Sequence, residues 1–158
     1  MADMNAGIGV APLESLKTMS GLEFLRGIVE GRLPAPPIAA LLGFRLAEVA
    51  PGFAVFTMAP EFRHYNPISV VHGGVAATLL DSCMSCAVQT HCEPGTAYTT
   101  LEIKINFVRA ITDKTGPVRA EGRTLYVGRR SGTAEGKIID AKGTLLAHGT
   151  TTCMLFSV

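Results

Sequence analysis

The chain contains no tryptophan, and aromatic residues make up only 6% of its 158 positions. It also lacks an excess of either charge, because 14 Lys and Arg offset 13 Asp and Glu and leave a formal net charge of +1. The longest basic run is the pair Arg129-Arg130, which does not support the basic surface of a nucleic-acid-binding protein. We therefore expect no nucleic acid as a partner.

Long hydrophobic runs are also missing. No apolar stretch approaches the roughly 18 residues that a transmembrane helix needs. The opening residues lack the basic start and the apolar run of a signal peptide. The sequence therefore predicts a cytoplasmic protein that does not bind a membrane.

Cysteine is scarce, with four residues at Cys83, Cys86, Cys92 and Cys153. The first two form a CxxC motif, but no second such motif completes a structural zinc site. A disulfide framework is not expected in a cytosolic chain of this size. We predict small buried thiols, no metal site and no cofactor.

The length and the 47% hydrophobic content predict one domain with a substantial core. Residues 1–18 show no sustained periodicity and are expected to be a mobile N-terminal lead, so that the domain spans 19–158. Helical spacing in 21–31, with Ser20 as N-cap, predicts one helix, and Pro34, Pro36 and Pro37 then begin a connection. A second helix is predicted over 75–88. The expected strands are 42–50, 53–60, 97–108, 118–127, 133–140 and 144–156, with a hairpin turn at 140–143. This order is typical of an α+β fold in which an antiparallel sheet wraps around one long helix.

The stretch from Asn66 to Gln89 is the most informative part of the chain. Here a His-Gly-Gly sequence opens a helix that is apolar nearly all round, and such a helix is buried. Its polar stripe includes Asp81 and Ser85, four residues apart. An ionised carboxylate in a core costs several kcal/mol unless it is paired or faces a cleft, and no basic residue lies within a turn of Asp81. Asp81 is therefore either a structural acid held by backbone donors or, as we favour, a reactive group.

The start of the same helix has a chemistry of its own. Gly73 and Gly74 allow close approach to the backbone, and the first N–H groups of a helix can donate to a developing oxyanion. His72 is either a base or an imidazole that fixes the loop. Eight residues separate Gly73 from Asp81, about 12 Å along a helix at 1.5 Å per residue. That distance is too long for one chain to hold a reacting centre between them, which points to a site built across a dimer.

Asn66-Pro67, His72-Gly73-Gly74 and Asp81 together resemble the signature of the hotdog-fold acyl-CoA thioesterases of the PaaI-like group, named for the phenylacetate pathway and 4-hydroxybenzoyl-CoA thioesterase. The resemblance extends over roughly 34–157. It departs from the group at Ser69, where Gly is frequent, and in having Asp as its acid. It implies a hotdog fold, hydrolysis of an acyl-CoA thioester, and a homodimer that continues the sheet and forms a dimer of dimers.

Roles for individual residues follow from this resemblance. The Gly73 N–H would polarise the thioester carbonyl with Asn66 nearby, and Asp81 would act as nucleophile or general base, with His72 and Ser85 in the catalytic set. Substrate would be bound by Gly74 and by the turn Arg129–Ser131, in which the two arginines, Arg129 and Arg130, and Ser131 suit the phosphates of CoA. Asn106 and Arg109 are expected to brace the fold.

Two other functions remain open at this point. A hotdog hydratase would pair the Asp with a His five residues on, where this chain has Cys86. A non-catalytic acyl-CoA-binding module would keep the glycines and arginines but would not need Asp81. Whether the acyl group is aryl, phenylacetyl or medium-chain is not readable from these residues.

Overall fold

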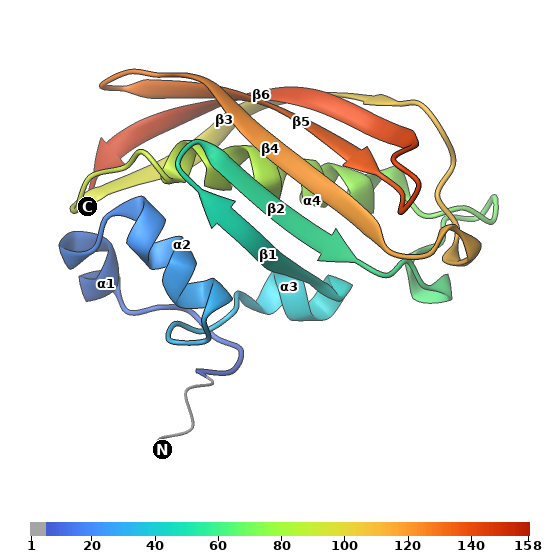
Figure 1. Ribbon diagram of the computed structural model, residues 1–158, viewed down its shortest axis with the longest axis horizontal. Coiled ribbons are helices and arrows are strands. Elements are labelled where there is room, and N and C mark those ends of the chain that lie inside the picture. Colours follow the sequence, from blue (N-terminus) through green and yellow to red (C-terminus); the bar gives the residue numbers. More distant parts are fainter. Residues whose placement is uncertain (1–5) are drawn as a thin grey trace.

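The computed structural model describes residues 6–158, and one antiparallel sheet curled around a long helix makes up most of it (Figure 1). The helices are α1 (Leu13–Thr18), α2 (Gly21–Val29), α3 (Pro37–Leu42) and α4 (Gly73–Gln89), with short 3₁₀ turns at Phe62–His64 and Asp113–Thr115. The strands are β1 (Phe44–Ala50), β2 (Phe53–Met58), β3 (Thr96–Phe107), β4 (Val118–Val127), β5 (Ser131–Ile139) and β6 (Leu145–Ser157). The α+β class and the hotdog arrangement are both confirmed.

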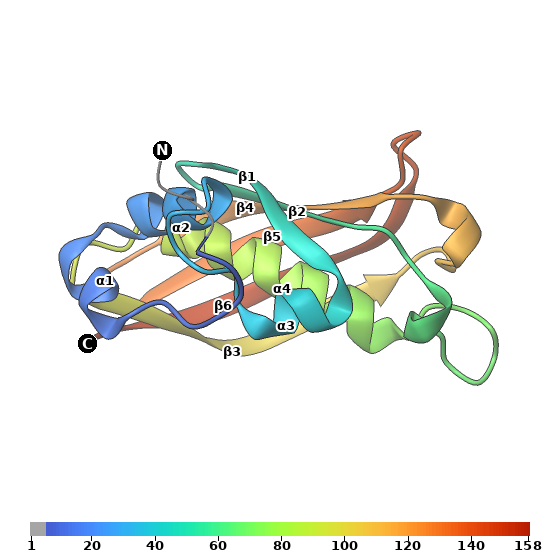
Figure 2. The ribbon, with the colours of Figure 1, turned by 90° about the horizontal axis from the view of Figure 1, so that it is seen from below.

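The six strands lie in the order β1-β2-β4-β5-β6-β3. Strand β3 follows α4 in the chain but pairs only with β6, so it forms the edge of the sheet opposite β1. Figure 2 shows α4 lying along the inner face of the sheet, with β1 and β2 on one side of it and β3 on the other. Helix α2 contacts both β1 and α4.

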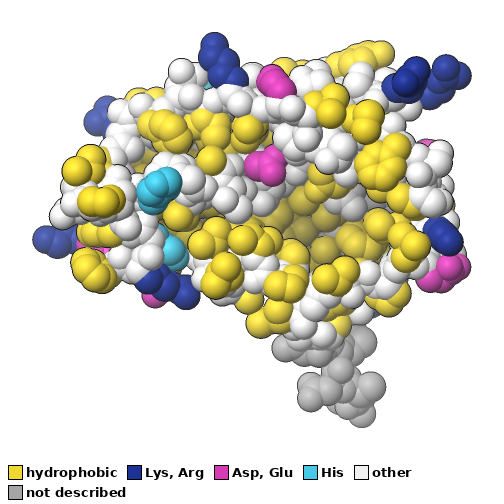
Figure 3. Space-filling view, turned by 180° about the vertical axis from the view of Figure 1, so that it is seen from behind, with side chains coloured by type: hydrophobic (Ala, Val, Ile, Leu, Met, Phe, Trp, Pro, Cys, Tyr) yellow, Lys and Arg dark blue, Asp and Glu magenta, His cyan; other side chains and the backbone are white. Residues whose placement is uncertain are grey.

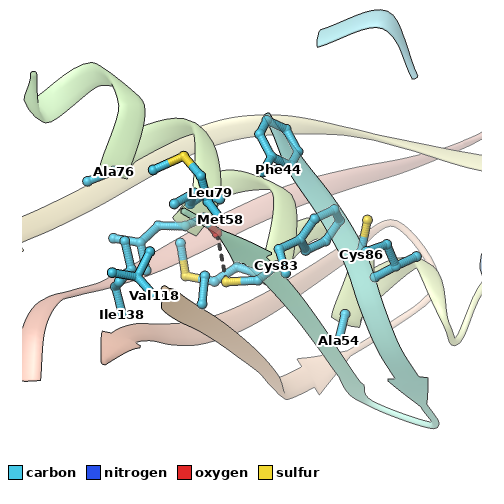
Figure 4. Close-up of a cluster of buried hydrophobic side chains, with 14 of the residues drawn as sticks. Phe44, Ala54, Met58, Ala76, Leu79, Cys83, Cys86, Val118 and Ile138 are labelled. Carbon is cyan, nitrogen blue, oxygen red and sulfur yellow. Dashed lines mark hydrogen bonds between the residues drawn. The ribbon is translucent and has the colours of Figure 1, made fainter. Parts of the chain in front are cut away.

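Helix α4 packs very closely against β4 and β5. A Cβ atom at Gly122 would overlap the backbone carbonyl of Cys83, and one at Gly136 would lie 2.7 Å from Cγ of Met84. Overpacking of this kind is destabilising, so these two glycines allow the helix to sit where it does. The core lies between helix and sheet (Figure 4), and its fully buried side chains include Leu79, Leu80, Cys83, Met84, Val88, Val118 and Ile138.

All four cysteines are free and buried, as the sequence predicted. Burial raises the pKa of Cys86 to about 12 and that of Cys92 to about 11, so both stay protonated at neutral pH. Within residues 6–158, no group of three or more His, Cys, Asp or Glu side chains could hold a metal ion. None of the described helices is long and apolar enough to cross a membrane.

The N-terminal region has more structure than the sequence predicted. Ser20 caps α2 in a capping box with Glu23, as expected, but α1 and α3 were not predicted. Pro37 is the first residue of α3, a position that favours a helix start, whereas we had assigned it to a connection. The backbone of Gly9 donates to Ala35 at 2.9 Å, which ties the predicted lead to the domain. Residues 1–5 of that lead lie outside the described residues.

A bulge interrupts the pairing of β3 with β6 between Thr100 and Glu102. Before the bulge, Thr100 faces α4, and after it Ile105 packs against the core. A bulge inserts one residue and so shifts the alternation of the side chains. Unbroken alternation from Thr100 would instead turn Glu102 and Lys104 toward the helix.

Candidate functional site

Asp81 is half-buried on α4 and has a neutral partner from another element. Its Oδ1 atom accepts a hydrogen bond of 2.8 Å from the hydroxyl of Thr100 on β3. In residues 6–158 no basic side chain forms an ion pair with it. This bond engages only Oδ1, so Oδ2 stays available to contact a substrate or water.

Asp81 faces a cavity of about 490 Å³. The walls come from α1, α2, α4 and β3, and they are Leu16, Phe24, Asp81, Ser85, Gln89, Ala97, Tyr98, Thr99 and Thr100. A carboxylate that faces a cavity fits the reactive reading of Asp81 better than the structural one. We call this space the acid cavity.

Ser85 lies in the acid cavity but its hydroxyl already has partners. It donates to the backbone carbonyl of Asp81 at 2.6 Å and lies 3.4 Å from the hydroxyl of Tyr98. Ser85 is also buried. Its predicted catalytic role stays a prediction, and the structure gives it a bond that holds the helix backbone beside the acid.

The start of α4 is organised by His72. Its Nδ1 atom accepts the N–H of Gly74 at 2.8 Å, so the imidazole caps the helix. This is the loop-fixing alternative for His72; a role as base stays a prediction. The N–H of Gly74 is therefore already hydrogen-bonded, and the predicted contact of Gly74 with substrate would have to use another atom of this residue. Gly73 is the first residue of the helix, and its N–H has no carbonyl to pair with inside the helix.

The loop before this helix is held by Asn66. Its Oδ1 atom accepts the N–H groups of Ile68 at 3.0 Å and Val70 at 3.3 Å, which leaves its NH₂ group as a potential donor. Ser69 adopts a φ of 66°, the left-handed conformation that glycine favours. The replacement of the frequent Gly by Ser69 has therefore not prevented a left-handed turn at this point.

Gly73 and Asn66 share a second cavity, of about 320 Å³, which we call the amide cavity. It is lined by Asn66, Val70, Val71, Gly73, Ala76, Phe107, Val108, Arg109, Ala110, Ile111, Leu146 and Ala147. A Cβ on Gly73 would lie 3.1 Å from the ring of Phe107, so a side chain here would crowd this wall. Arg109, which we expected to brace the fold, lines this cavity and is exposed.

The acid cavity and the amide cavity have no lining residue in common. Strand β3 contributes to the acid cavity near its start and to the amide cavity at its end, Phe107. Within one chain, the structure therefore keeps Gly73 and Asp81 in separate cavities, as their spacing along the helix predicted.

The turn Arg129–Ser131 lies near the C-terminal end of α4. The next residue, Gly132, packs against Val88 near the end of α4, and the backbone carbonyl of Arg130 accepts the N–H of Leu155. The residues Arg129, Arg130 and Ser131 are all exposed. Their contact with CoA stays a prediction.

Two site residues were missed by the sequence reasoning, Thr100 and Tyr98. Both stand on β3, and both line the acid cavity. The sequence contained a signal for them. Tyr98 and Thr100 occupy even-numbered positions, whereas Ile103, Ile105 and Phe107 occupy odd-numbered positions, which would point to the opposite face of an unbroken strand. Such a change of phase marks a bulge, and bulges are frequent next to active sites.

Comparison with known proteins identifies the family. The profile of the Thioesterase superfamily matches residues 69–147. The chain is 29% identical over 106 residues to the proofreading thioesterase EntH of Klebsiella pneumoniae, covering 67% of this chain and 76% of that protein. It is 29% identical over 124 residues to 1,4-dihydroxy-2-naphthoyl-CoA hydrolase of Escherichia coli, covering 78% and 86%. A putative thioesterase of Ralstonia eutropha, related to phenylacetic acid degradation, superposes with a TM-score of 0.75 at 26% identity, covering 83% and 98%.

The chain thus belongs to the Thioesterase superfamily and is a thioester hydrolase. The resemblance to PaaI-like hotdog thioesterases is confirmed. The hydratase and the non-catalytic module, which the sequence left open, are both disfavoured by this membership.

Thr100 should act as a positioning residue for Asp81. We expect Thr100→Val to lower kcat about 10- to 100-fold with little change in KM, because a hydrogen bond to a charged group contributes about 1.5–3 kcal/mol. Steady-state release of thiol from the best thioester substrate measures this. Thr100→Ser, which keeps the donor, should restore most of kcat. Thr150→Val, at an exposed threonine on β6 outside both cavities, serves as the matched control. Wild-type kcat in Thr100→Val would show that the bond has no part in turnover.

Proposed function

We propose that the protein hydrolyses an acyl-CoA thioester to the free acid and CoA. The observation that carries the proposal is Asp81, a carboxylate without a cationic partner that faces a cavity and is oriented by Thr100. The names of the two relatives above, a thioesterase and a CoA-ester hydrolase, support this choice of substrate class.

The active unit we propose is a homodimer formed along β3. This strand has twelve residues, and within residues 6–158 no strand pairs with its outer side. Leu101 and Phe107 are each 59% exposed, and Figure 3 shows hydrophobic side chains gathered across this hollowed face while charged groups lie mainly toward its rim. A long edge strand with apolar side chains readily pairs with another chain.

The positions of the cavities suggest the register of this pairing. Two β3 strands related by a two-fold axis between Ile103 and Lys104 would pair antiparallel, with Thr100 opposite Phe107 of the partner subunit. Thr100 lines the acid cavity and Phe107 lines the amide cavity. Each acid cavity would then meet the amide cavity of the other chain, and two composite sites would result. A dimer of these dimers is the larger assembly we propose, with the cytoplasm as its location.

In the composite site, the thioester carbonyl would accept the Gly73 N–H of one chain, near Asn66. This polarisation stabilises the negative charge that develops on the carbonyl oxygen. Asp81 of the other chain then acts in one of two ways. As nucleophile it forms a mixed anhydride and expels CoA thiolate, and water later cleaves the anhydride; as general base it takes a proton from the attacking water. In both routes water supplies the proton that ends on the CoA thiolate. The acid gains the oxygen of water when water attacks the acyl carbon, either directly or in the anhydride, and Asp81 is then restored.

The turn Arg129–Ser131 is proposed to hold the nucleotide phosphates of CoA. Guanidinium groups match phosphate oxygens, and the Ser131 hydroxyl adds a donor. The exposure of all three side chains and their place near the end of α4 support the proposal.

The first test concerns Asp81. Asp81→Asn should lower kcat at least 100-fold, the lower range for losing an acid, base or nucleophile, while the fold and assembly persist. CoA release from a panel of acyl-CoA esters, measured with a thiol reagent, gives the rates. Thermal unfolding should show equal or greater stability, since a charge leaves an apolar setting. The adjacent Ser82→Ala is the control, and near wild-type turnover by Asp81→Asn would remove this carboxylate from the mechanism.

A second test addresses the composite site. Asp81→Ala and Gly73→Val chains should each be inactive alone. Refolded together in equal amounts, they should regain about a quarter of wild-type activity, because half of randomly paired dimers are hybrids with one intact site. Light scattering should give two or four times the 16.7 kDa of one chain. A fully active species with the mass of one chain would contradict the dimeric site.

A third test separates CoA binding from chemistry. Arg129→Ala should raise KM for acyl-CoA with a smaller change in kcat, the signature of lost uniform binding. The effect should shrink as salt rises, and it should largely vanish with an acyl-pantetheine thioester that lacks the nucleotide phosphates. Lys142→Ala, in the hairpin turn before β6, is the control. Equal losses on both substrates would mean that Arg129 supports the fold or the reacting centre.

A further inference from the structure

An apolar cavity of about 240 Å³ lies beneath the N-terminal segment. Its walls come from that segment, α2, β1, β2, α4 and β3, and they are Gly9, Val10, Ala11, Phe24, Leu25, Ile28, Pro34, Pro36, Leu46, Phe56, Cys86, Gln89 and Tyr98. None of these residues carries a charge. We call this space the N-terminal chamber.

The chamber adjoins the acid cavity. Phe24, Gln89 and Tyr98 line both spaces, so these three side chains form the boundary between them. The Tyr98 hydroxyl at this boundary lies 3.4 Å from the hydroxyl of Ser85, one helical turn from Asp81. A group attached to a carbonyl beside Asp81 therefore has a short path into the chamber.

We propose that the N-terminal chamber holds the acyl group of the substrate, and that it selects an uncharged, apolar acyl group without hydroxyl substituents. This inference rests on the proposed acyl-CoA hydrolysis and names its substrate class. A hydroxyl buried in the chamber away from the Gln89 and Tyr98 boundary meets mainly apolar walls and loses its hydrogen bonds to water, which costs free energy, whereas each methylene gains from leaving water.

The volume sets the size of the acyl group. The chamber's volume of about 240 Å³ is several times that of a single water site, so it has room for an acyl group of medium size. An octanoyl or phenylacetyl group matches this size. The partly buried side chain of Ile28 stands among the walls, so we expect it to limit the length of the acyl group.

The walls that set this limit lie mostly outside the part of the chain that defines its family. The Thioesterase superfamily profile matches residues 69–147, whereas ten of the lining residues lie between Gly9 and Phe56. The chemistry and the substrate choice are thus carried by different segments. Changes in α2 should alter which acyl group is hydrolysed and leave the reacting centre intact.

Ile28 offers the sharpest test, because it is partly buried on α2 and lies apart from the catalytic groups. The measurement is kcat/KM for straight-chain acyl-CoA esters from acetyl to tetradecanoyl, with phenylacetyl-CoA and a dihydroxybenzoyl-CoA. In the wild type, kcat/KM should rise about fourfold per added methylene up to octanoyl or decanoyl and then level or fall. Phenylacetyl-CoA should be hydrolysed at least tenfold more efficiently than the dihydroxybenzoyl ester.

Two variants should move this limit in opposite directions. Ile28→Phe should lower kcat/KM for octanoyl-CoA at least tenfold and leave butanoyl-CoA within twofold, which also shows that the protein is folded. Ile28→Ala should shift the optimum to longer chains. Arg26→Ala, on the exposed side of the same helix, should leave the profile unchanged.

The outcomes separate this inference from the proposed function. Three results would overturn the proposed role of the chamber and leave acyl-CoA hydrolysis standing. They are hydrolysis that does not depend on chain length, unchanged profiles in both Ile28 variants, and a preference for the dihydroxybenzoyl ester. If no ester releases CoA, the proposed function fails, and calorimetry then judges the chamber alone. Octanoyl-CoA should bind at least tenfold more tightly than acetyl-CoA, and Ile28→Phe should remove that difference; equal affinities would overturn the inference.

Discussion

The close contact between α4 and the sheet is the constraint on which the rest of the structure depends. It exists because Gly122 and Gly136 present no side chain where the helix passes. With the helix pressed against the sheet, most of its surface is buried from Cys83 onward. Asp81 and Ser85 are then confined to the side that faces β3, where a cavity reaches them. A polar stripe that would be costly in a sealed core thereby becomes the wall of the cavity in which we propose the reaction.

Strand β3 connects the proposed chemistry with the proposed assembly. Its first half supplies the hydroxyl of Thr100 to the acid, and its last residue, Phe107, covers the start of the helix. The bulge between the halves allows polar groups to face Asp81 and apolar groups to face the core in one strand. The opposite edge of this strand is unpaired in the single chain, and its exposed apolar residues are the surface through which we propose that two incomplete sites complete each other.

The N-terminal segment and α2 cover one side of the sheet and the central helix, and α2 adds the buried Leu25 to the core. The segment is held by backbone hydrogen bonds to 31–35 and by the apolar face of α2, which contacts β1 and α4. Side chains of this cover that line only the N-terminal chamber, such as Ile28, can change without touching the acid cavity or the helix start. This separation gives a simple physical route by which one reacting centre can serve different acyl groups.

Much of this protein could be predicted from local sequence. The buried helix, its Gly73 start, the isolated Asp81, the capping of α2 by Ser20 and the six strands follow from periodicity, turn residues and helix-end chemistry, which act over a few neighbouring residues. Helices α1 and α3 and the bulge in β3 were missed although Pro37 and the change of phase in β3 gave local signals for the last two. The partner of Asp81 and the cavities did not follow, because they depend on segments far apart in the chain, such as Thr100 meeting Asp81 across two elements. Only the tertiary structure decides such meetings, because packing, and not local preference, sets which faces come together.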